Sequence, residues 1–300
     1  MDMTHNKCCR HGASLRRRRR RRRKILRSII FSCSIIAVAV FVAVGSRMIR
    51  SGDGRTNKYD VEAGNNTYDN AVIENSKISE KNKIQNNQLM LDDIMNSTQY
   101  PKQLQELALK NEEALEFVYD YPTEHVKEHT IDLTEEASMD SVPLFVQWDK
   151  RWGYEKYSGN FFAASGCGPT TLSMVVVYLT HNRDASPLAV AKYSKEAGYS
   201  VDGSGSSWTL ISEGCRHYGV KAKTVALDES RMKAELDAGH PIVVNVGPGD
   251  FTDTGHFMVI TGYDDEGFSI NDPNSIEKSG KRWLFKNISS QIRAVWSMYV

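Results

Sequence analysis

One cysteine in this chain has the surroundings of a nucleophile. Cys167 lies between two glycines and is followed at once by Pro169 and a run of apolar residues. Gly166 and Gly168 let the backbone turn tightly and leave space beside the sulfur, and proline suits the first turn of a helix. The pattern predicts a buried helix over 170–179, whose N-terminal N–H groups and dipole favour the thiolate. A small buried thiol in a glycine-rich turn is the alternative.

His256 is the histidine best placed to serve as the base that a cysteine nucleophile needs. It follows Gly255 directly and begins an apolar stretch, 256–263, that is predicted to be a strand. A tight turn and a second strand over 268–272 complete a hairpin, which brings Asp272 back toward His256. There the carboxylate can accept a ring N–H, fix the tautomer and favour the imidazolium. The alternatives are a surface histidine at a strand end and an aspartate that forms a turn before proline.

These segments together resemble the bacterial papain-like peptidases that are related to the bacteriocin-processing, double-glycine leader peptidases. The resemblance rests on Ser165 to Thr171, Gly255 to Tyr263 and Ile270 to Pro273, with Gln147 upstream. It covers about residues 140–300 and implies a triad of Cys167, His256 and Asp272, with no metal and no organic cofactor. It also implies that Gln147 helps to stabilise the oxyanion. Many papain-like enzymes carry that glutamine closer to the cysteine than Gln147 lies.

The second half of the chain has the pattern of an α+β domain, in which helices come first and an antiparallel sheet follows. We expect a papain-like cysteine peptidase fold over 141–300, preceded by a small helical region over 87–140 that serves as a scaffold. A short strand over 142–146 should precede the cysteine helix. Further helices are expected over 187–197, 208–218 and 229–236, and further strands over 221–227, 241–246, 256–263, 268–272, 282–285 and 294–300.

The N-terminal part is predicted to anchor this domain in a membrane through one transmembrane helix. Residues 16–23 are all arginine, and residues 28–46 carry no charge and are long enough to span a hydrocarbon core of about 30 Å. The positive-inside rule keeps the basic tail, 1–27, in the cytoplasm and sends the C-terminal part outside. A cleaved signal peptide followed by secretion is the main alternative, and a buried core helix is the weakest. Residues 47–86 are polar and are expected to form a disordered linker.

The charge of the chain is divided unevenly between its parts. The formal net charge of the 300 residues is +1, but residues 1–50 hold 14 of the 38 Lys and Arg and one of the 37 acidic residues. The remaining residues therefore carry an excess of 12 acidic residues, which argues against nucleic-acid binding and hints at basic or neutral substrates. Only two of the five cysteines lie beyond residue 50, so neither a disulfide framework nor a zinc-binding spacing is present.

These features predict a membrane-anchored, extracytoplasmic cysteine peptidase. Its expected partners are a peptide or protein substrate and the membrane, which it enters through residues 28–46, and no nucleic acid. A cell-wall amidase or endopeptidase that cuts peptidoglycan stem peptides uses the same chemistry and is the first alternative. A binding module that keeps the fold with an idle site is the second. The sequence has no ATP-binding motif, so coupling to an exporter is not implied.

Overall fold

The computed structural model describes the backbone of residues 62–300 and the side chains from residue 78 onward. The predicted basic tail (1–27), the predicted span (28–46) and the first part of the predicted linker lie outside the described residues. The chain divides into two compact units, Met1–Asn75 and Ser76–Val300, and the described strands all belong to the second. In the part of the chain that the structure describes, no helix combines the length and the apolar composition needed to cross a membrane.

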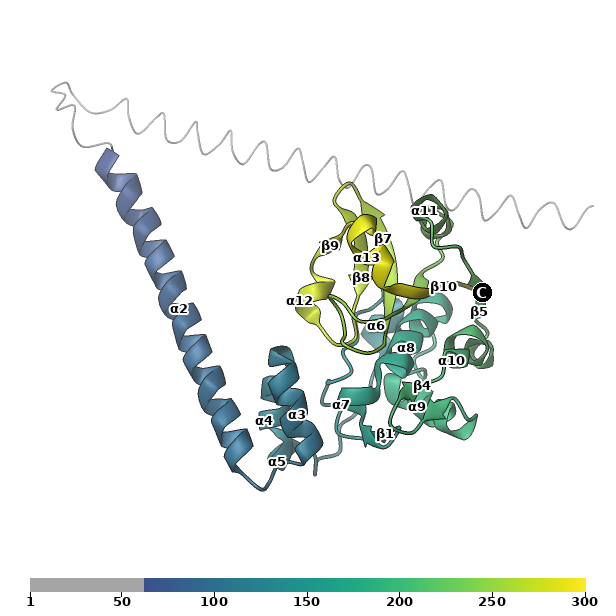
Figure 1. Cartoon of the computed structure of the whole chain (residues 1–300), viewed down its shortest axis with the longest axis horizontal. Helices are drawn as coiled ribbons and strands as arrows, with labels where there is room; N and C mark the ends of the chain where they lie inside the picture. The colour runs from purple at the N-terminus through teal and green to yellow at the C-terminus, as the bar shows by residue number, and fades with distance from the viewer. Residues whose placement is uncertain (1–61) are drawn as a thin grey trace, which may run out of the picture. The chain divides into compact units, whose positions relative to one another are not determined.

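Helices make up the first part of the described chain (Figure 1). In order they are α2 (Glu62–Asn96), α3 (Lys102–Lys110), η1 (Glu112–Ala114), α4 (Leu115–Tyr119), α5 (Tyr121–Glu124) and α6 (Thr134–Ser138). Apolar side chains of these helices, among them Ile94, Leu104 and Phe117, share one core with Phe161 and Ala163. The helical region expected over 87–140 is therefore packed onto the domain that follows it.

The expected linker is helical where the structure describes it. Residues 62–86 belong to α2, whereas their polar composition favoured a disordered segment. The side chains of residues 78–86 are all exposed, so composition predicted their contact with solvent but not their backbone conformation. The segment contains a single glycine and no proline, and hence nothing in it interrupts helical hydrogen bonding.

The central helix of the domain is α8 (Cys167–Thr180), and it begins at the cysteine singled out above. The elements around it are β1 (Lys156–Tyr157), β2 (Asn160–Phe161), α7 (Phe162–Ser165), α9 (Pro187–Glu196), β3 (Ser200–Val201), β4 (Gly205–Ser206), α10 (Thr209–Ser212) and η2 (Gly214–Tyr218). Residues 168–177 are all buried, because α8 packs against α6, α9 and α10 and against the sheet. The predicted helices over 170–179 and 187–197 are confirmed.

Six antiparallel strands form the main sheet, in the order β5-β10-β6-β7-β8-β9. They are β5 (Lys221–Thr224), β6 (Ile242–Val246), β7 (His256–Asp264), β8 (Gly267–Asn271), β9 (Arg282–Trp283) and β10 (Ile292–Tyr299), with α11 (Glu229–Asp237), α12 (Ile276–Ser279), α13 (Phe285–Ile288) and η3 (Ser289–Gln291) between them. The predicted order of helices before an antiparallel sheet is thus confirmed, and so are the expected helix over 229–236 and most of the strands.

Both faces of this sheet are covered, which explains the uninterrupted apolar runs of its central strands. Val243 and Phe257 join the core that surrounds α8, while their neighbours Val244 and Met258 join a second core. Met232 of α11 also belongs to that second core. Alternate side chains of a strand point to opposite faces, so a sheet between two helical layers requires apolar residues at successive positions.

Several expected elements are wrong or shortened. The strand expected over 221–227 ends at Thr224. Residues 142–146 form no strand, because Pro143 lacks a donor and the Asn271 side chain occupies the carbonyls of Val142 and Pro143. The helix expected over 208–218 breaks at Glu213, where φ is −126°, into α10 and η2. The strand expected over 282–285 ends at Trp283, and α13 begins two residues later.

The hairpin of β7 and β8 has the pairing that positions the candidate site. Val259 lies opposite Asn271, so the next pair along the hairpin would join Met258 to Asp272. His256 is two residues further along β7, a diagonal spacing across which long side chains reach each other. Asp272 itself lies one residue beyond β8 and forms an isolated bridge with Ser275.

Candidate active site

Cys167 sits at the start of α8 in a tightly packed turn. Gly166 precedes the helix with φ −85°, a conformation open to any residue, so the turn itself does not demand glycine. Glycine is required here because there is no room for a side chain. An added Cβ at Gly166 would lie 2.6 Å from the Phe162 ring, and one at Gly168 would lie 2.5 Å from Ser206 Oγ. The two glycines therefore allow close packing around the half-buried sulfur, which is the second of the two roles predicted for them.

The start of α8 is tied to the start of β7. Thr171, one turn into the helix, donates from its Oγ1 to the carbonyl oxygen of Phe257, at 3.1 Å. Asn245 on β6 donates from its side chain to the carbonyl of His256, at 3.2 Å. Both bonds lie inside the protein; the first ties the strand that carries His256 to the helix that carries Cys167, and the second ties it to the neighbouring strand β6.

His256 and Asp272 form a buried pair. The distance between His256 Nε2 and Asp272 Oδ1 is 2.7 Å, and the two residues are 6% and 0% exposed. Asp272 Oδ1 also accepts a hydrogen bond from the backbone N–H of Asn274, at 2.8 Å, while Oδ2 is buried and has no partner among the described residues. Because Nε2 is held by the carboxylate, Nδ1 is the ring nitrogen left for proton exchange.

The electrostatics of the site favour an ion pair between Cys167 and His256. Burial opposes the charged imidazole, but the charge of Asp272 and its hydrogen bond outweigh burial and raise the pKa of His256 to about 10. Burial likewise opposes the thiolate, yet hydrogen bonding to His256, the imidazolium charge and the backbone N–H groups of Phe257 and Gly168 lower the pKa of the Cys167 thiol below its ordinary value. At neutral pH these shifts favour a thiolate beside an imidazolium.

Cys167 opens into a cleft of about 680 Å³. Its lining includes residues 203–206, Trp208, residues 245–248, Thr254, Gly255, Phe257 and Arg293. Five of the lining residues are glycines, so much of the wall is backbone. A cleft with this lining offers N–H and C=O groups to an extended peptide, and Cys167 is placed where a carbonyl carbon can reach its sulfur.

Gln147 lies near the site but its side chain is engaged elsewhere. Its Nε2 donates to the carbonyl of Ala163 at 2.7 Å and more weakly to Asn274 Oδ1 at 3.3 Å. Gln147 is buried and does not line the cleft that contains Cys167. The structure therefore brings Gln147 to the segment just before α8 and to the loop after Asp272. To donate to an oxyanion, its amide would have to turn away from Ala163.

The other histidines of the domain have separate partners. His181 bonds through Nδ1 to the carbonyl of Ala137 at 2.7 Å, and His240 lies 3.0 Å from Glu235. His217 stacks on Tyr193 with ring centroids 4.0 Å apart. Among the side chains described, from residue 78 onward, no group of three His, Cys, Asp or Glu is arranged to hold a metal ion.

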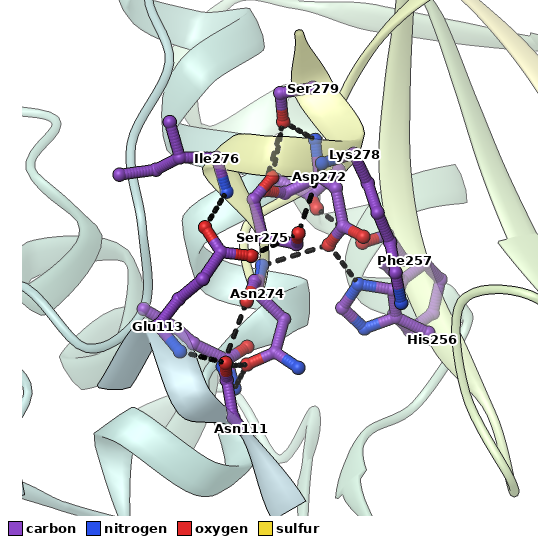
Figure 2. A network of polar contacts seen from close by, with 12 residues as sticks. Asn111, Glu113, His256, Phe257, Asp272, Asn274, Ser275, Ile276, Lys278 and Ser279 are labelled. Carbon is purple, nitrogen blue, oxygen red and sulfur yellow. Dashed lines mark hydrogen bonds and ion pairs between the residues drawn. The ribbon is translucent and has the colours of Figure 1, made fainter. Parts of the chain in front are cut away.

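A polar network around the loop after Asp272 was not found from the sequence (Figure 2). It joins Asn111 and Glu113 of the N-terminal helices to residues 274–277, next to the His256–Asp272 pair. The turn residues Pro273 and Asn274 and the capping residue Ser275 do mark a tight loop after Asp272, but no local signal names its distant partners.

Comparisons with known proteins found a matching family model and distantly similar solved structures. A model of the Peptidase_C39-like family matches residues 139–300. Among solved structures, the peptidase domain of Streptococcus ComA, a bifunctional ABC transporter of a quorum-sensing pathway, is 20% identical, with 45% of this chain and 90% of that chain covered and a TM-score of 0.36. A putative C39-like peptidase from Bacillus anthracis is 17% identical, with 56% and 97% covered and a TM-score of 0.33. No curated protein matches the chain.

The lowered pKa of Cys167 predicts selective alkylation. Iodoacetamide should modify Cys167 with a midpoint below the ordinary thiol pKa of about 8.5, because the thiolate persists until the pH falls through its lowered pKa. In His256→Ala the midpoint should move above that of the wild type, because the charge and hydrogen bond that stabilise the thiolate are gone. Peptide mapping by mass spectrometry measures both.

Cys215 is the internal control for this experiment. It is fully buried, and burial raises its pKa to about 11, so it should remain unmodified while the protein is folded. Equal labelling of Cys167 and Cys215 at neutral pH would contradict an activated thiol.

Proposed function

The chain belongs to the Peptidase_C39-like family, and we propose that it is a membrane-anchored, extracytoplasmic cysteine peptidase that hydrolyses peptide bonds through Cys167, His256 and Asp272. The observation that carries the proposal is the buried contact of 2.7 Å between His256 and Asp272, beside a cysteine at a helix N-terminus. The substrate is a peptide or protein that enters the cleft in front of Cys167.

The reaction begins with the ion pair. The Cys167 thiolate attacks the carbonyl carbon of the scissile amide, and the π electrons of the carbonyl move to its oxygen, which becomes the oxyanion of a tetrahedral intermediate. Backbone N–H groups at the start of α8 stabilise this charge, and Gln147 can add a donor if its amide turns from Ala163. His256 Nδ1 then gives its proton to the leaving nitrogen, the C–N bond breaks, and an acyl-enzyme remains.

Deacylation uses the same groups in reverse. Neutral His256 takes a proton from water, and the resulting hydroxide attacks the thioester carbon of the acylated Cys167. Collapse of the second tetrahedral intermediate breaks the C–S bond, releases the carboxylic acid product and regenerates the thiolate beside the imidazolium. Throughout the cycle Asp272 holds His256 in one tautomer through Nε2 and stabilises its charged form.

Substitutions of the three residues test the proposal. Cys167→Ala and His256→Ala should abolish hydrolysis in a folded protein, because each removes a group that the covalent step requires. Asp272→Asn keeps an acceptor for the ring N–H but removes the charge, so kcat should fall while some activity remains. Hydrolysis of a quenched peptide library and of purified cell wall, followed side by side, measures the rates and separates a peptidase from a wall-lytic enzyme.

Two further variants complete this test. Cys215→Ala should keep most of the activity, because this thiol is a buried part of the core.

Gln147→Ala should lower kcat by up to roughly 10²–10³-fold if its amide reaches the oxyanion, and a wild-type rate would remove Gln147 from the mechanism. The idea of a triad would be falsified if Cys167→Ala hydrolysed at the wild-type rate a substrate that the purified protein cleaves.

The membrane anchor is the second part of the proposal. The uncharged stretch 28–46 directly follows the basic tail 1–27, and the positive-inside rule orients such a segment with its basic end in the cytoplasm. Residues 51–300 would then lie outside the membrane, where the catalytic domain meets extracytoplasmic peptides.

Protease treatment of intact cells tests the orientation. The C-terminal part should be removed while cytoplasmic markers stay protected, since only segments outside the membrane are accessible. An antibody against the catalytic domain follows the loss on a blot. Survival of the domain under conditions that degrade a known surface protein would refute the orientation, and recovery of the domain in the medium with a new N-terminus near residue 46 would show a cleaved signal instead.

A further inference from the structure

The loop that follows Asp272 is held by a network of short contacts. The Asp272 backbone N–H donates to Ser279 Oγ at 2.9 Å, and the carboxylate accepts from the Asn274 N–H. Ser275 begins α12 and accepts from the Lys278 N–H at 3.1 Å. Each of these bonds lies within residues 272–279, so on their own they make the loop compact but do not fix it to the rest of the protein.

Gln147 and Trp148 supply part of that attachment, through bonds from the Gln147 backbone N–H to the Pro273 carbonyl and from Trp148 Nε1 to the Asn274 carbonyl, at 3.2 Å. Two residues of the N-terminal helices supply the part that leads away from the domain core. Glu113 accepts hydrogen bonds through Oε2 from the backbone N–H groups of Ile276, at 2.7 Å, and Glu277, at 3.1 Å, and its Oε1 accepts one from the Ser275 hydroxyl. Asn111 donates from Nδ2 to the carbonyl of Asn274 at 2.9 Å and to its side-chain oxygen at 3.1 Å. Figure 2 shows both side chains reaching the loop beside Asp272 and His256.

Asn111 and Glu113 are themselves held together. The Asn111 Oδ1 accepts the backbone N–H of Glu113 at 3.0 Å, so one side chain caps η1 and grips the loop at the same time. The helices that carry the pair are fixed to the domain by the core shared with Phe161 and Ala163. Both residues lie before residue 139, where the match to the family model begins.

We propose that Glu113 and Asn111 are positioning residues, which hold the 272–279 loop so that Asp272 keeps His256 oriented and charged. The proposal rests on the function proposed for the triad and makes residues 87–124 part of the working enzyme. A carboxylate that accepts two backbone N–H groups and a hydroxyl fixes a loop more firmly than neutral contacts do, because charge-assisted hydrogen bonds are roughly twice as strong. Loss of this attachment would let Asp272 move relative to His256.

Glu113→Gln tests the role with little change in size. The NH₂ of the glutamine amide would face the N–H and hydroxyl donors of the loop, so the loop loses part of its attachment. The pKa of His256 should then fall, and the pKa of Cys167 should rise. We expect the pH midpoint of Cys167 alkylation to move upward and kcat to fall by roughly 10- to 100-fold, with a smaller change in KM. Glu113→Asp, which keeps the charge, should recover part of both. Asn111→Asp keeps the cap of η1 but removes the donor to Asn274, and it should shift the midpoint in the same direction.

Asp120→Asn is the matched control. Asp120 lies in the same helical region and accepts from Lys150 at 2.6 Å, but it does not contact the 272–279 loop. It should leave the alkylation midpoint unchanged. Equal shifts in Glu113→Gln and Asp120→Asn, or no shift in either Glu113→Gln or Asn111→Asp, would overturn the proposal.

A double variant isolates the path of the effect. In an Asp272→Asn background, Glu113→Gln should cause no further shift, because the residue through which it acts has already lost its charge. Full additivity would overturn the positioning role. Alkylation requires no substrate, so these results stand even if the protein hydrolyses no peptide, and an absence of hydrolysis in the wild type would count against the proposed function alone.

A second inference comes from the charge of the cleft. Apart from Cys167, Arg293 is the one residue in the cleft lining with a charged side chain at neutral pH. Its Nη1 donates to the carbonyl of Ser290 at 3.0 Å, and its Nε lies 2.8 Å from where a Cβ of Gly247 would stand. No ion pair of the described residues includes Arg293. The Arg293 guanidinium therefore lies over Gly247 in the cleft wall and has N–H donors that are available to a ligand.

We infer that Arg293 binds a carboxylate of the substrate, on the premise that the cleft is the peptidase site. Guanidinium donors match the two oxygens of a carboxylate, and the partner is either an acidic side chain near the scissile bond or a free C-terminus. A preference for acidic substrates would be opposite to the preference for basic or neutral substrates that the acidic composition of the chain beyond residue 50 suggested.

Matched peptides test this inference. The wild type should cleave a peptide with glutamate near the scissile bond about tenfold or more faster, in kcat/KM, than the same peptide with glutamine, and a free-acid and amide pair tests the C-terminal carboxylate. In Arg293→Gln the ratio of the favoured pair should fall to about one, with the neutral peptide cleaved as before. Arg231→Gln, a change of the same charge outside the cleft, should leave the ratio intact.

The outcomes separate the role of Arg293 from the proposed hydrolysis of peptides. Unchanged ratios in Arg293→Gln, or no preference for either acidic peptide in the wild type, would overturn the role of Arg293. If the wild type cleaves none of the peptides, binding to Cys167→Ala, measured by fluorescence anisotropy, still compares the acidic and neutral peptides. In that case only the proposed hydrolysis fails.

Discussion

A carboxylate and an imidazole buried together are the interaction on which the rest of the site depends. In a poorly solvated site their attraction is much stronger than in water, but each charged group loses hydration, so the pair is favourable only with good geometry and further hydrogen bonds. The hairpin register gives the geometry, and the Asn274 N–H gives one further bond. The charge of Cys167 follows from this pair, since an imidazolium that persists to high pH is what stabilises the neighbouring thiolate.

The parts of this site that the sequence predicted are those with local causes. A glycine, a cysteine, a proline and an apolar run identify the start of α8, and a tight turn between two short apolar strands places Asp272 near His256. Glu113 and Asn274 carry no such signal, because their contacts join segments about 160 residues apart and depend on how whole helices pack. The same limit explains the errors: nothing local shows that Asn271 occupies the carbonyls of residues 142 and 143.

Gln147 shows how a residue can be correctly placed and yet be bonded differently from its expected role. Its backbone N–H donates to the carbonyl of Pro273 and its side chain to Ala163 and Asn274, so it joins the segment before α8 to the loop after Asp272. Cys167 and Asp272, the two ends of the proposed triad, therefore depend on the same few polar side chains. Any group that pulls Gln147 toward the oxyanion also removes a bond from this connection.

The separation between Asn111 and the 272–279 loop has a consequence for how the protein matures. Bringing together segments so far apart along the chain requires closing a long loop, and such contacts form only after the intervening chain is available. The helix that carries Cys167 ends at Thr180, 94 residues before Asn274 is synthesised. Until His256 and Asp272 have been made and paired, the growing chain therefore holds the Cys167 thiol without the neighbouring charge that lowers its pKa.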